Sequence, residues 1–293
     1  MKLDNLTNPV WDRCDNLRDP AVYKDKEGTY HIFYSRYSNK DWTRPENWSI
    51  GHVITKDFIS YKNDRDISPK GYASPGDLIE LNGKYILPYQ SYPEVPTMLV
   101  YSVSEDLKTW SEPVPFLAEA LDLPWNKAKR VIDPCFVLDG NKLHCFFVGT
   151  DRESKEFPIN LVGHAFTEDM SLKNWTITTV NEPLIGAGER NADGAENVTV
   201  YKVNGKWAMI FSEGLKEQHL AYAESEDLVH WEIKNKIDVG MQDWMKVRYG
   251  APYVFFEEDG YKMILMGENE DAHTTFGLLS SDDGINWKLN PEK

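Results

Sequence analysis

The sequence of 293 residues predicts an all-β fold, a five-bladed β-propeller with four-stranded blades around a central channel. Two repeats support this prediction. In the first, a short apolar strand leads into a Ser/Thr-x-Asp turn and then an aromatic residue, and the five copies end at Tyr61, Trp110, Trp175, Trp231 and Trp287. Neighbouring copies are 49, 65, 56 and 56 residues apart, which is too long for a solenoid turn and suits a propeller blade with variable loops.

The second repeat lies upstream of each copy and consists of two strands joined by a tight turn that contains glycine. The five candidate hairpins span residues 22–34, 78–89, 135–148, 198–211 and 253–266. Four of their turns are Asn-Gly or Asp-Gly, the strongest short-range signal for a hairpin. Each unit therefore provides a hairpin, a third strand and, around the aromatic residue, an outer fourth strand. We expect residues 1–293 to form a single catalytic propeller domain with no appended β-sandwich.

Composition narrows the possible partners. The chain has 32 basic and 47 acidic residues, which gives a formal net charge of −15. Nucleic acids and anionic membranes both favour surfaces rich in Lys and Arg, so neither is an expected partner. A neutral ligand such as a carbohydrate is compatible with this charge, which also fits a role in solubility alone. The sequence leaves the oligomeric state open.

Cysteine usage and the ends of the chain bear on its compartment. Cys14, Cys135 and Cys145 make an odd number without metal-ligand spacing, so we expect free thiols. The start lacks the apolar run of a secretory signal, and no stretch is long and apolar enough to span a membrane. As the sequence stands, the expected location is the cytoplasm, or the periplasm or exterior if a leader has been removed.

Acidic residues stand where the innermost strands of three blades begin. Asp19, Glu196 and Ala251 each lie nine residues before the glycine of their hairpin, and Asp133 lies seven residues before its glycine. Because side chains alternate along a strand, these odd offsets predict that all four residues share one face. Three blades would then direct a carboxylate toward the central channel.

Three clustered acids are electrostatically unfavourable, because like charges at short range raise one another's pKa. Cleavage of a glycosidic bond would explain the cluster, since one carboxyl donates a proton to the leaving oxygen while another activates water or attacks carbon. A hard cation such as Ca²⁺ would also explain it, because Ca²⁺ prefers several oxygen ligands. An Asp-Pro turn at the start of a strand accounts for one acid more easily than for three.

The motifs around these acids carry a family resemblance. Arg18-Asp19-Pro20, Ile132-Asp133-Pro134 and Gly194-Ala195-Glu196, together with residues 73–77 ahead of the turn at 82–85, resemble the five-bladed glycoside hydrolases of family 43, which include arabinanases, α-L-arabinofuranosidases and β-xylosidases. The resemblance spans all five blades. It implies that Asp19 is the general base, that Glu196 is the general acid, and that Asp133 tunes the pKa of the acid and orients the site.

Blade five departs from that family. Its members commonly place a histidine at the channel position, often beside a cation, whereas this chain has Arg248-Tyr249-Gly250-Ala251. We therefore expect no required cofactor, with a structural Ca²⁺ in the channel as an alternative. The stretch from residue 249 to residue 267 also resembles the related fructan and sucrose hydrolases, which retain anomeric configuration. Their Trp-Met-Asn-Asp-Pro signature in blade one is absent, so we rank them second.

Several other residues are candidates for substrate binding. Arg248 could pair with a carboxylate or bind sugar hydroxyls. Asp77 is out of phase with the other acids and needs a bulge to face the channel. His273 follows Asn269-Glu270-Asp271 in a loop and could contact ligand or cation. Four tryptophans in loops outside the repeat could stack on sugar rings or pack the loops: Trp42, Trp48, Trp125 and Trp244.

Together these features predict an inverting, exo-acting glycoside hydrolase for a terminal pentose or furanoside residue of an oligosaccharide or polysaccharide. The alternatives are a retaining enzyme of the fructofuranosidase type, an enzyme that uses phosphate in place of water, and a non-catalytic sugar-binding propeller. The intact set of three acids argues against the last. No basic cluster accompanies the acids in sequence, although four arginines could assemble one in space: Arg18, Arg130, Arg190 and Arg248.

Overall fold

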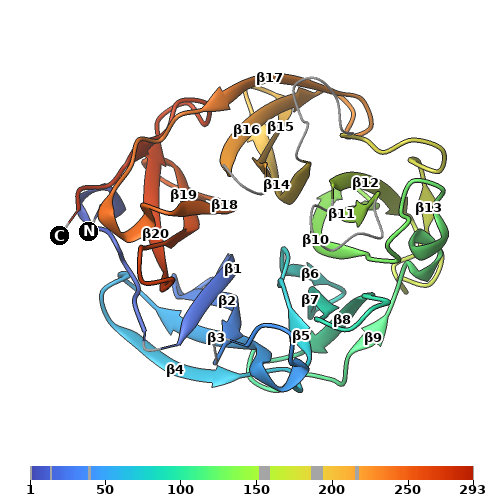
Figure 1. Ribbon diagram of the computed structural model, residues 1–293, viewed down its shortest axis with the longest axis horizontal. Helices are drawn as coiled ribbons and strands as arrows, with labels where there is room; N and C mark the ends of the chain where they lie inside the picture. Colours follow the sequence, from blue (N-terminus) through green and yellow to red (C-terminus); the bar gives the residue numbers. More distant parts are fainter. Residues whose placement is uncertain are drawn as a thin grey trace.

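The computed structural model describes residues 2–13, 15–38, 41–151, 159–185, 194–214 and 218–292. Cys14 and Arg190 lie outside the described residues. The described residues form five antiparallel sheets arranged in a ring around a channel (Figure 1), which confirms the predicted propeller. No helix among them combines the length and the apolar character that a membrane span needs.

Each blade uses consecutive segments of the chain, and its first strand lies nearest the channel (Figure 1). Blades one and two contain β1 (Asn16–Lys24), β2 (Tyr30–Tyr37), β3 (Trp48–Thr55), β4 (Tyr61–Asp66), β5 (Tyr72–Ala73), β6 (Ile79–Leu81), β7 (Lys84–Ser91), β8 (Leu99–Ser104) and β9 (Val114–Pro115). Blade three contains β10 (Ile132–Asp139), β11 (Lys142–Thr150), β12 (Asn160–Thr167) and β13 (Thr176–Ile177). Blades four and five contain β14 (Ala195–Val203), β15 (Lys206–Glu213), β16 (His219–Ser225), β17 (Trp231–Ile237), β18 (Arg248–Glu257), β19 (Gly260–Glu268), β20 (Thr274–Ser281) and β21 (Lys288–Leu289).

Short 3₁₀ helices occur in the connections between strands and at the N-terminus. They are η1 (Leu3–Asn5), η2 (Pro45–Asn47), η3 (Ala118–Asp122) and η4 (Asp243–Met245). Hairpins and short turns account for most of the remaining connections, as the glycine turns in the sequence predict.

The Ser/Thr-x-Asp phrase is a turn between the third and fourth strands of a blade. In blade one, the Asp57 carboxylate accepts the backbone N–H groups of Ile59 and Ser60 at 2.9 and 2.8 Å, while the Thr55 hydroxyl accepts that of Phe58 at 2.9 Å. Blade four repeats the carboxylate bonds at Asp227. A short polar side chain that satisfies turn N–H groups stabilises the turn, which explains why this phrase recurs in the sequence.

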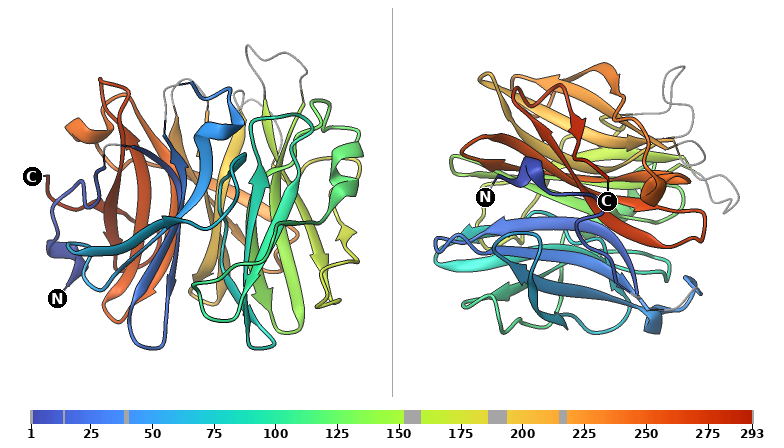
Figure 2. Two further views of the ribbon diagram at one scale, coloured as in Figure 1. Left: turned by 90° about the horizontal axis from the view of Figure 1, so that it is seen from below. Right: turned by 90° about the vertical axis from the view of Figure 1, so that its left-hand side faces the viewer.

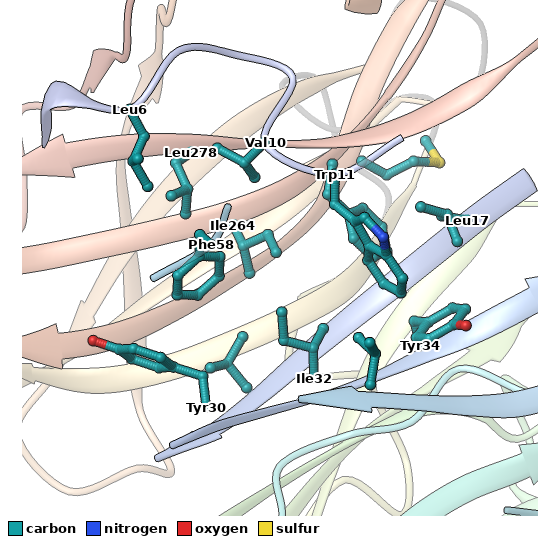
Figure 3. Packing of buried hydrophobic residues seen from close by; sticks show 14 of the residues in the cluster. Leu6, Val10, Trp11, Leu17, Tyr30, Ile32, Tyr34, Phe58, Ile264 and Leu278 are labelled. Carbon is teal, nitrogen blue, oxygen red and sulfur yellow. The ribbon is translucent and has the colours of Figure 1, made fainter. Parts of the chain in front are cut away.

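The core consists of hydrophobic clusters between neighbouring blades. The cluster shown in Figure 3 joins blades five and one to the N-terminal segment, where the edge of Trp11 packs against the ring of Tyr34 at a centroid distance of 4.9 Å. Asn8 also bridges Glu292 near the C-terminus. The two chain ends therefore lie side by side, as Figures 1 and 2 show, and the N-terminal segment closes the ring.

The inner strands share one irregularity that positions the site. The strand register shifts just after Arg18, Ile132, Glu196 and Gly250, and the next residue in each case has a positive φ near 50°. Together with blade two, the positive-φ residues are Asp19, Ser74, Asp133, Asn197 and Ala251. A bulge of this kind bends the strand and redirects a side chain. All five blades therefore present one redirected residue at the same depth in the channel.

Candidate active site

Asp19 lies at the bulge of β1 and is held by donors from three blades. The hydroxyls of Ser35 and Ser74 donate to its Oδ2 at 2.7 and 3.2 Å, and the Asn197 amide donates to its Oδ1 at 3.4 Å. Ser35 belongs to the same blade, whereas Ser74 and Asn197 occupy the equivalent bulge positions of blades two and four. These neutral donors fix the orientation of the carboxylate and leave Oδ1 with only one long contact among the described residues.

Asp133 is the most buried of the three acids. Its side chain has little exposure, since the residue is 8% exposed, and its backbone N–H donates to the Gln90 side chain at 2.6 Å. Burial raises the pKa of Asp133 to about 8, and the nearby charges of Glu196 and Asp19 act in the same direction, against a hydrogen bond from Ser74 and the charge of Arg130. The structure thus brings all three acids within electrostatic range of one another.

Glu196 is held by two neutral amides. The Asn160 side chain donates to its Oε2 at 2.6 Å, and the Gln218 side chain donates to its Oε1 at 2.9 Å. Asn160 begins β12 in blade three, and Gln218 directly precedes β16 in blade four. Both carboxylate oxygens therefore have a fixed partner at the boundary between two blades.

The predicted strand phase is wrong for Glu196. In the observed register Glu196 pairs with Ser212 just before the bulge, as Arg18 pairs with Ser35, and Asn197 occupies the position equivalent to Asp19. Counting back from the hairpin glycine failed because the turns differ in length between blades and because a bulge changes the alternation of side chains. Glu196 nevertheless lies close enough for its charge to raise the pKa of Asp133.

A cavity in the channel takes its lining from every blade. It is lined by the five positive-φ residues and by their neighbours Pro20, Pro75, Gly76, Asp77, Pro134, Val198, Pro252 and Tyr253. Gly76 allows blade two to approach blade three closely, because a Cβ atom there would lie 1.9 Å from the carbonyl oxygen of Pro134. Asp19 and Asp133 are among the residues that line the cavity.

Asp77 reaches the channel through a break in the inner strand rather than through a bulge. The break separates β5 from β6, and Asp77 lies within it. Burial raises the pKa of Asp77 to about 6, while hydrogen bonds with the Cys135 thiol and the Tyr253 hydroxyl oppose that shift. Both hydrogen-bond partners of Asp77 belong to the protein, so substrate binding by Asp77 stays a prediction.

The described residues do not fit the Ca²⁺ alternative well. They contain no group of three or more His, Cys, Asp or Glu side chains placed to hold a metal ion. The carboxylate of Asp77 accepts hydrogen bonds from the thiol of Cys135 and the hydroxyl of Tyr253. A thiol and a phenol that carry their protons act as donors here and are not the oxygen ligands that Ca²⁺ prefers. A structural Ca²⁺ stays a prediction without support from these residues, and no step below depends on a metal.

Three of the four loop tryptophans are buried, which agrees with packing, the second of their two expected roles. Trp42 is 55% exposed, whereas Trp48, Trp125 and Trp244 are 2%, 7% and 6% exposed. Trp48 stacks on Tyr37 at a centroid distance of 4.6 Å. These three side chains stabilise the blades instead of lining a sugar site, and Trp42 alone of the four remains a candidate for stacking.

Glycines create the space for two of these indoles. A Cβ atom at Gly267 or Gly277 would lie 2.3 Å from the Trp244 ring, and one at Gly149 would lie 2.5 Å from the Trp125 ring. Trp125 and Trp244 precede the positive-φ residue of their blade by eight and seven residues, and Trp11 precedes its own by eight. This regular spacing indicates that the three tryptophans pack in equivalent places, a signal that was missed when Trp125 and Trp244 were assigned to loops.

Arg248 and His273 both have protein partners. The Arg248 guanidinium donates to the Glu268 carboxylate at 2.6 Å across the hairpin of β18 and β19. His273 contacts the Asp12 carboxylate at 2.6 Å. Arg248 therefore pairs with a carboxylate, which is one of its two expected roles. Sugar binding by Arg248 or by His273 stays a prediction.

Sequence reasoning missed several residues that hold the acids. Ser74 had a signal, because it precedes the glycine of its hairpin by nine residues, as Asp19 does. Asn160 and Gln218 had none, since nothing near them in sequence points to Glu196. Tyr92 was also missed, and its hydroxyl lies within range of the charges of Asp19 and Asp133.

Comparison with known proteins places this geometry in context. Residues 68–247 match the family described as the glycosyl hydrolases family 32 N-terminal domain, a stretch that includes Asp133 and Glu196 and not Asp19. A search of curated proteins by sequence gives no match.

Solved structures are similar in fold at low identity. A thermostable family-43 glycoside hydrolase has a TM-score of 0.73 and 15% identity, with 98% of this chain and 96% of that chain covered. An α-L-arabinofuranosidase from Lactobacillus brevis has a TM-score of 0.73 and 14% identity, with 100% and 99% covered. A mutant α-L-arabinanase from Cellvibrio cellulosa has a TM-score of 0.69 and 12% identity, with 95% and 98% covered.

The raised pKa of Asp133 predicts a pH-dependent loss of stability. The folded protein binds this proton more tightly than an unfolded chain, in which the pKa is about 3.9, so stability falls as the pH rises from about 4 to about 8. Replacing Asp133 with Asn should remove that loss. Urea unfolding gives the free energy of unfolding of the variant minus that of the native protein. We expect this difference to be larger at pH 8 than at pH 5, by about 1 kcal/mol or more.

Asp122→Asn is the control for this experiment, because Asp122 is an exposed aspartate paired with Lys129. If Asp133→Asn gave the same difference from the native protein at both pH values, Asp133 would not be a buried acid with a raised pKa.

Proposed function

We propose that this chain, which belongs to the family of the glycosyl hydrolases family 32 N-terminal domain, removes a terminal pentose or other furanoside residue from oligosaccharides or polysaccharides. The chain is a glycoside hydrolase, and its substrate class and its mechanism are what we propose. The observation that carries the proposal is the proximity of three acids from three different blades. Asp19 and Asp133 line the cavity, Glu196 lies near enough for its charge to act on Asp133, and its neighbour Asn197 donates to Asp19.

Glu196 is the proposed general acid. It would protonate the leaving oxygen as the glycosidic bond breaks, which contributes typically about 10²–10⁴-fold to the rate. The amides of Asn160 and Gln218 orient this carboxyl group, because each donates a hydrogen bond to one of its two oxygens. A proton donor is effective only when it lies in hydrogen-bonding reach of the leaving group.

Asp19 is the proposed general base. Ser35 and Ser74 bind its Oδ2, which leaves Oδ1 as the oxygen to accept a proton from the attacking water. Asp133 would be protonated at neutral pH, given its pKa of about 8. As a neutral carboxyl it can donate a hydrogen bond to a sugar hydroxyl, and it then adds no further negative charge beside Asp19.

The cavity supports exo action and a small terminal sugar. Its lining residues come from all five blades, an arrangement that closes around one end of a glycan more readily than it admits a continuous polysaccharide chain. The furanoside class rests on the motif resemblance, and two of the similar solved structures are an α-L-arabinofuranosidase and an α-L-arabinanase. The proposed reaction uses the chain's own carboxyl groups and needs no cofactor.

Substrates with different leaving groups test the role of Glu196. Glu196→Ala should lose about 10²–10⁴-fold in kcat/KM on natural glycosides, whose leaving oxygens need protonation. The same variant should lose far less on dinitrophenyl glycosides, which leave without a proton. Steady-state kinetics on both substrate types, with Glu226→Ala as an exposed surface control, give the comparison. Equal losses on the two types would show that Glu196 is not the acid.

The configuration of the first-formed sugar tests the role of Asp19. If Asp19 activates water, the product is inverted, and the Asp19 and Glu196 carboxyls should stand about 6.5–9.5 Å apart in a substrate complex to admit that water. We expect inversion in proton NMR spectra recorded before mutarotation. A retained anomer would instead make Asp19 a nucleophile, as in the fructan and sucrose hydrolases that blade five resembles.

A further inference from the structure

Two arginines beside the acids have no hydrogen-bonded partner among the described residues. The other five arginines that the structure describes each donate to a carboxylate, a carbonyl or a hydroxyl oxygen: Arg13, Arg36, Arg44, Arg65 and Arg248. No such bond involves the side chains of Arg18 and Arg130, and both residues are half-buried. A half-buried guanidinium with free donors is unusual in a chain that carries an excess of acidic residues.

Both arginines are close in sequence to acids that line the cavity. Arg18 directly precedes Asp19 in β1, and Arg130 precedes Asp133 by three residues. The backbone of Arg130 is fixed by a bridge to Thr97 and by a bond from its N–H to the Asn126 side chain at 3.3 Å. The two positions belong to blades one and three, on either side of blade two (Figure 1).

Tyr92 of blade two is within electrostatic range of both arginines. Its backbone N–H donates to the carbonyl of Gly71 at 2.8 Å, and its ring packs edge-on against Trp48 at a centroid distance of 4.8 Å. The charges of Arg18 and Arg130 both reach its hydroxyl group. Two cations and one phenol from three consecutive blades thus lie within electrostatic range of one another and of the acids Asp19 and Asp133.

The acids do not use these guanidinium groups. The donors to Asp19 are the neutral side chains of Ser35, Ser74 and Asn197, and those to Glu196 are neutral amides. If the arginines served only to neutralise the acids, we would expect the two-pronged Arg–carboxylate bonds that such pairs usually form. Their planar forks of N–H groups remain available, and that geometry matches a carboxylate or a phosphate.

We infer that Arg18 and Arg130, with Tyr92, bind an anionic group next to the hydrolytic site. This inference rests on the proposed function and adds that the substrate carries a carboxylate or phosphate, or that free phosphate binds beside it. A net charge of −15 gives the protein no long-range attraction for an anion, so recognition depends on these local donors. Neutral glycosides would then be the poorer substrates.

Binding of simple sugars and phosphate tests this site independently of hydrolysis. Isothermal titration calorimetry of the full chain would compare arabinose 5-phosphate with arabinose, galacturonate with galactose, and inorganic phosphate alone. We expect one anionic probe or more to bind at least about 10-fold more tightly than its neutral counterpart, or phosphate to bind alone. The preferred probe shows whether the group is a sugar phosphate, a sugar carboxylate or a free phosphate.

Variants of the two arginines assign the effect to this site. Arg18→Gln and Arg130→Gln should each reduce binding of the preferred anion by about 10-fold or more, and should affect the neutral sugar less. Arg18→Lys, which keeps the charge, should lose less than Arg18→Gln. The matched control is Arg44→Gln, because Arg44 lies in an exposed loop and pairs with Asp41 and Glu46; it should keep the preference unchanged.

Equal binding of charged and neutral probes, or an anion preference that survives both Gln variants, would overturn the inference. Circular dichroism of each variant separates loss of binding from loss of fold. Failure of the chain to cleave any glycoside would contradict the proposed function instead, and an Arg-dependent anion preference would still support the site. The two failures are therefore distinguishable.

Discussion

Hydrogen bonds between neighbouring blades, made at the positive-φ residues of three inner strands, fix the ring and the site together. The N–H of the positive-φ residue is accepted by a side chain of the preceding blade at three junctions: Ser74 by Ser35, Asp133 by Gln90 and Ala251 by Ser212. A left-handed backbone at a residue other than glycine costs about 1–3 kcal/mol and persists only where the surroundings hold it. In this propeller the neighbouring blade holds it, and the same geometry turns Asp19 and Asp133 into the channel.

The arrangement of acids that the proposed reaction needs lowers the stability of the fold. Three acids close together oppose folding, and burial makes Asp133 unfavourable to ionise. Neutral donors, and not arginines, orient the carboxyl groups of Asp19 and Glu196. The arginines Arg18 and Arg130 remain free to recognise a ligand. The three acids thus explain a cost in stability and the proposed division between acid and base. The two arginines explain the proposed preference for anionic substrates.

Local signals predicted the fold well, because each blade repeats a glycine hairpin and an Asp turn whose hydrogen bonds lie within a few residues. The site was predicted less completely. Asp19 and Asp133 were placed on one face, but Glu196 was assigned the wrong phase, since turn length and a bulge both alter a count along the strand. Trp125 and Trp244 read as loop residues because the glycines that receive them are distant in sequence. Asn160 and Gln218 meet Glu196 only through tertiary structure.

Turnover by Asp19→Asn tests most directly whether the acids at the channel mouth carry out hydrolysis. The substitution keeps the shape of the side chain and an oxygen that Ser35 and Ser74 can still bind, so the fold and its melting temperature should hardly change. On any aryl glycoside that the native protein cleaves, we predict that kcat/KM falls by about 10²–10⁴-fold or more. A variant that folds normally and cleaves at a rate close to that of the native protein would contradict the assignment of Asp19 and, with it, the proposed site.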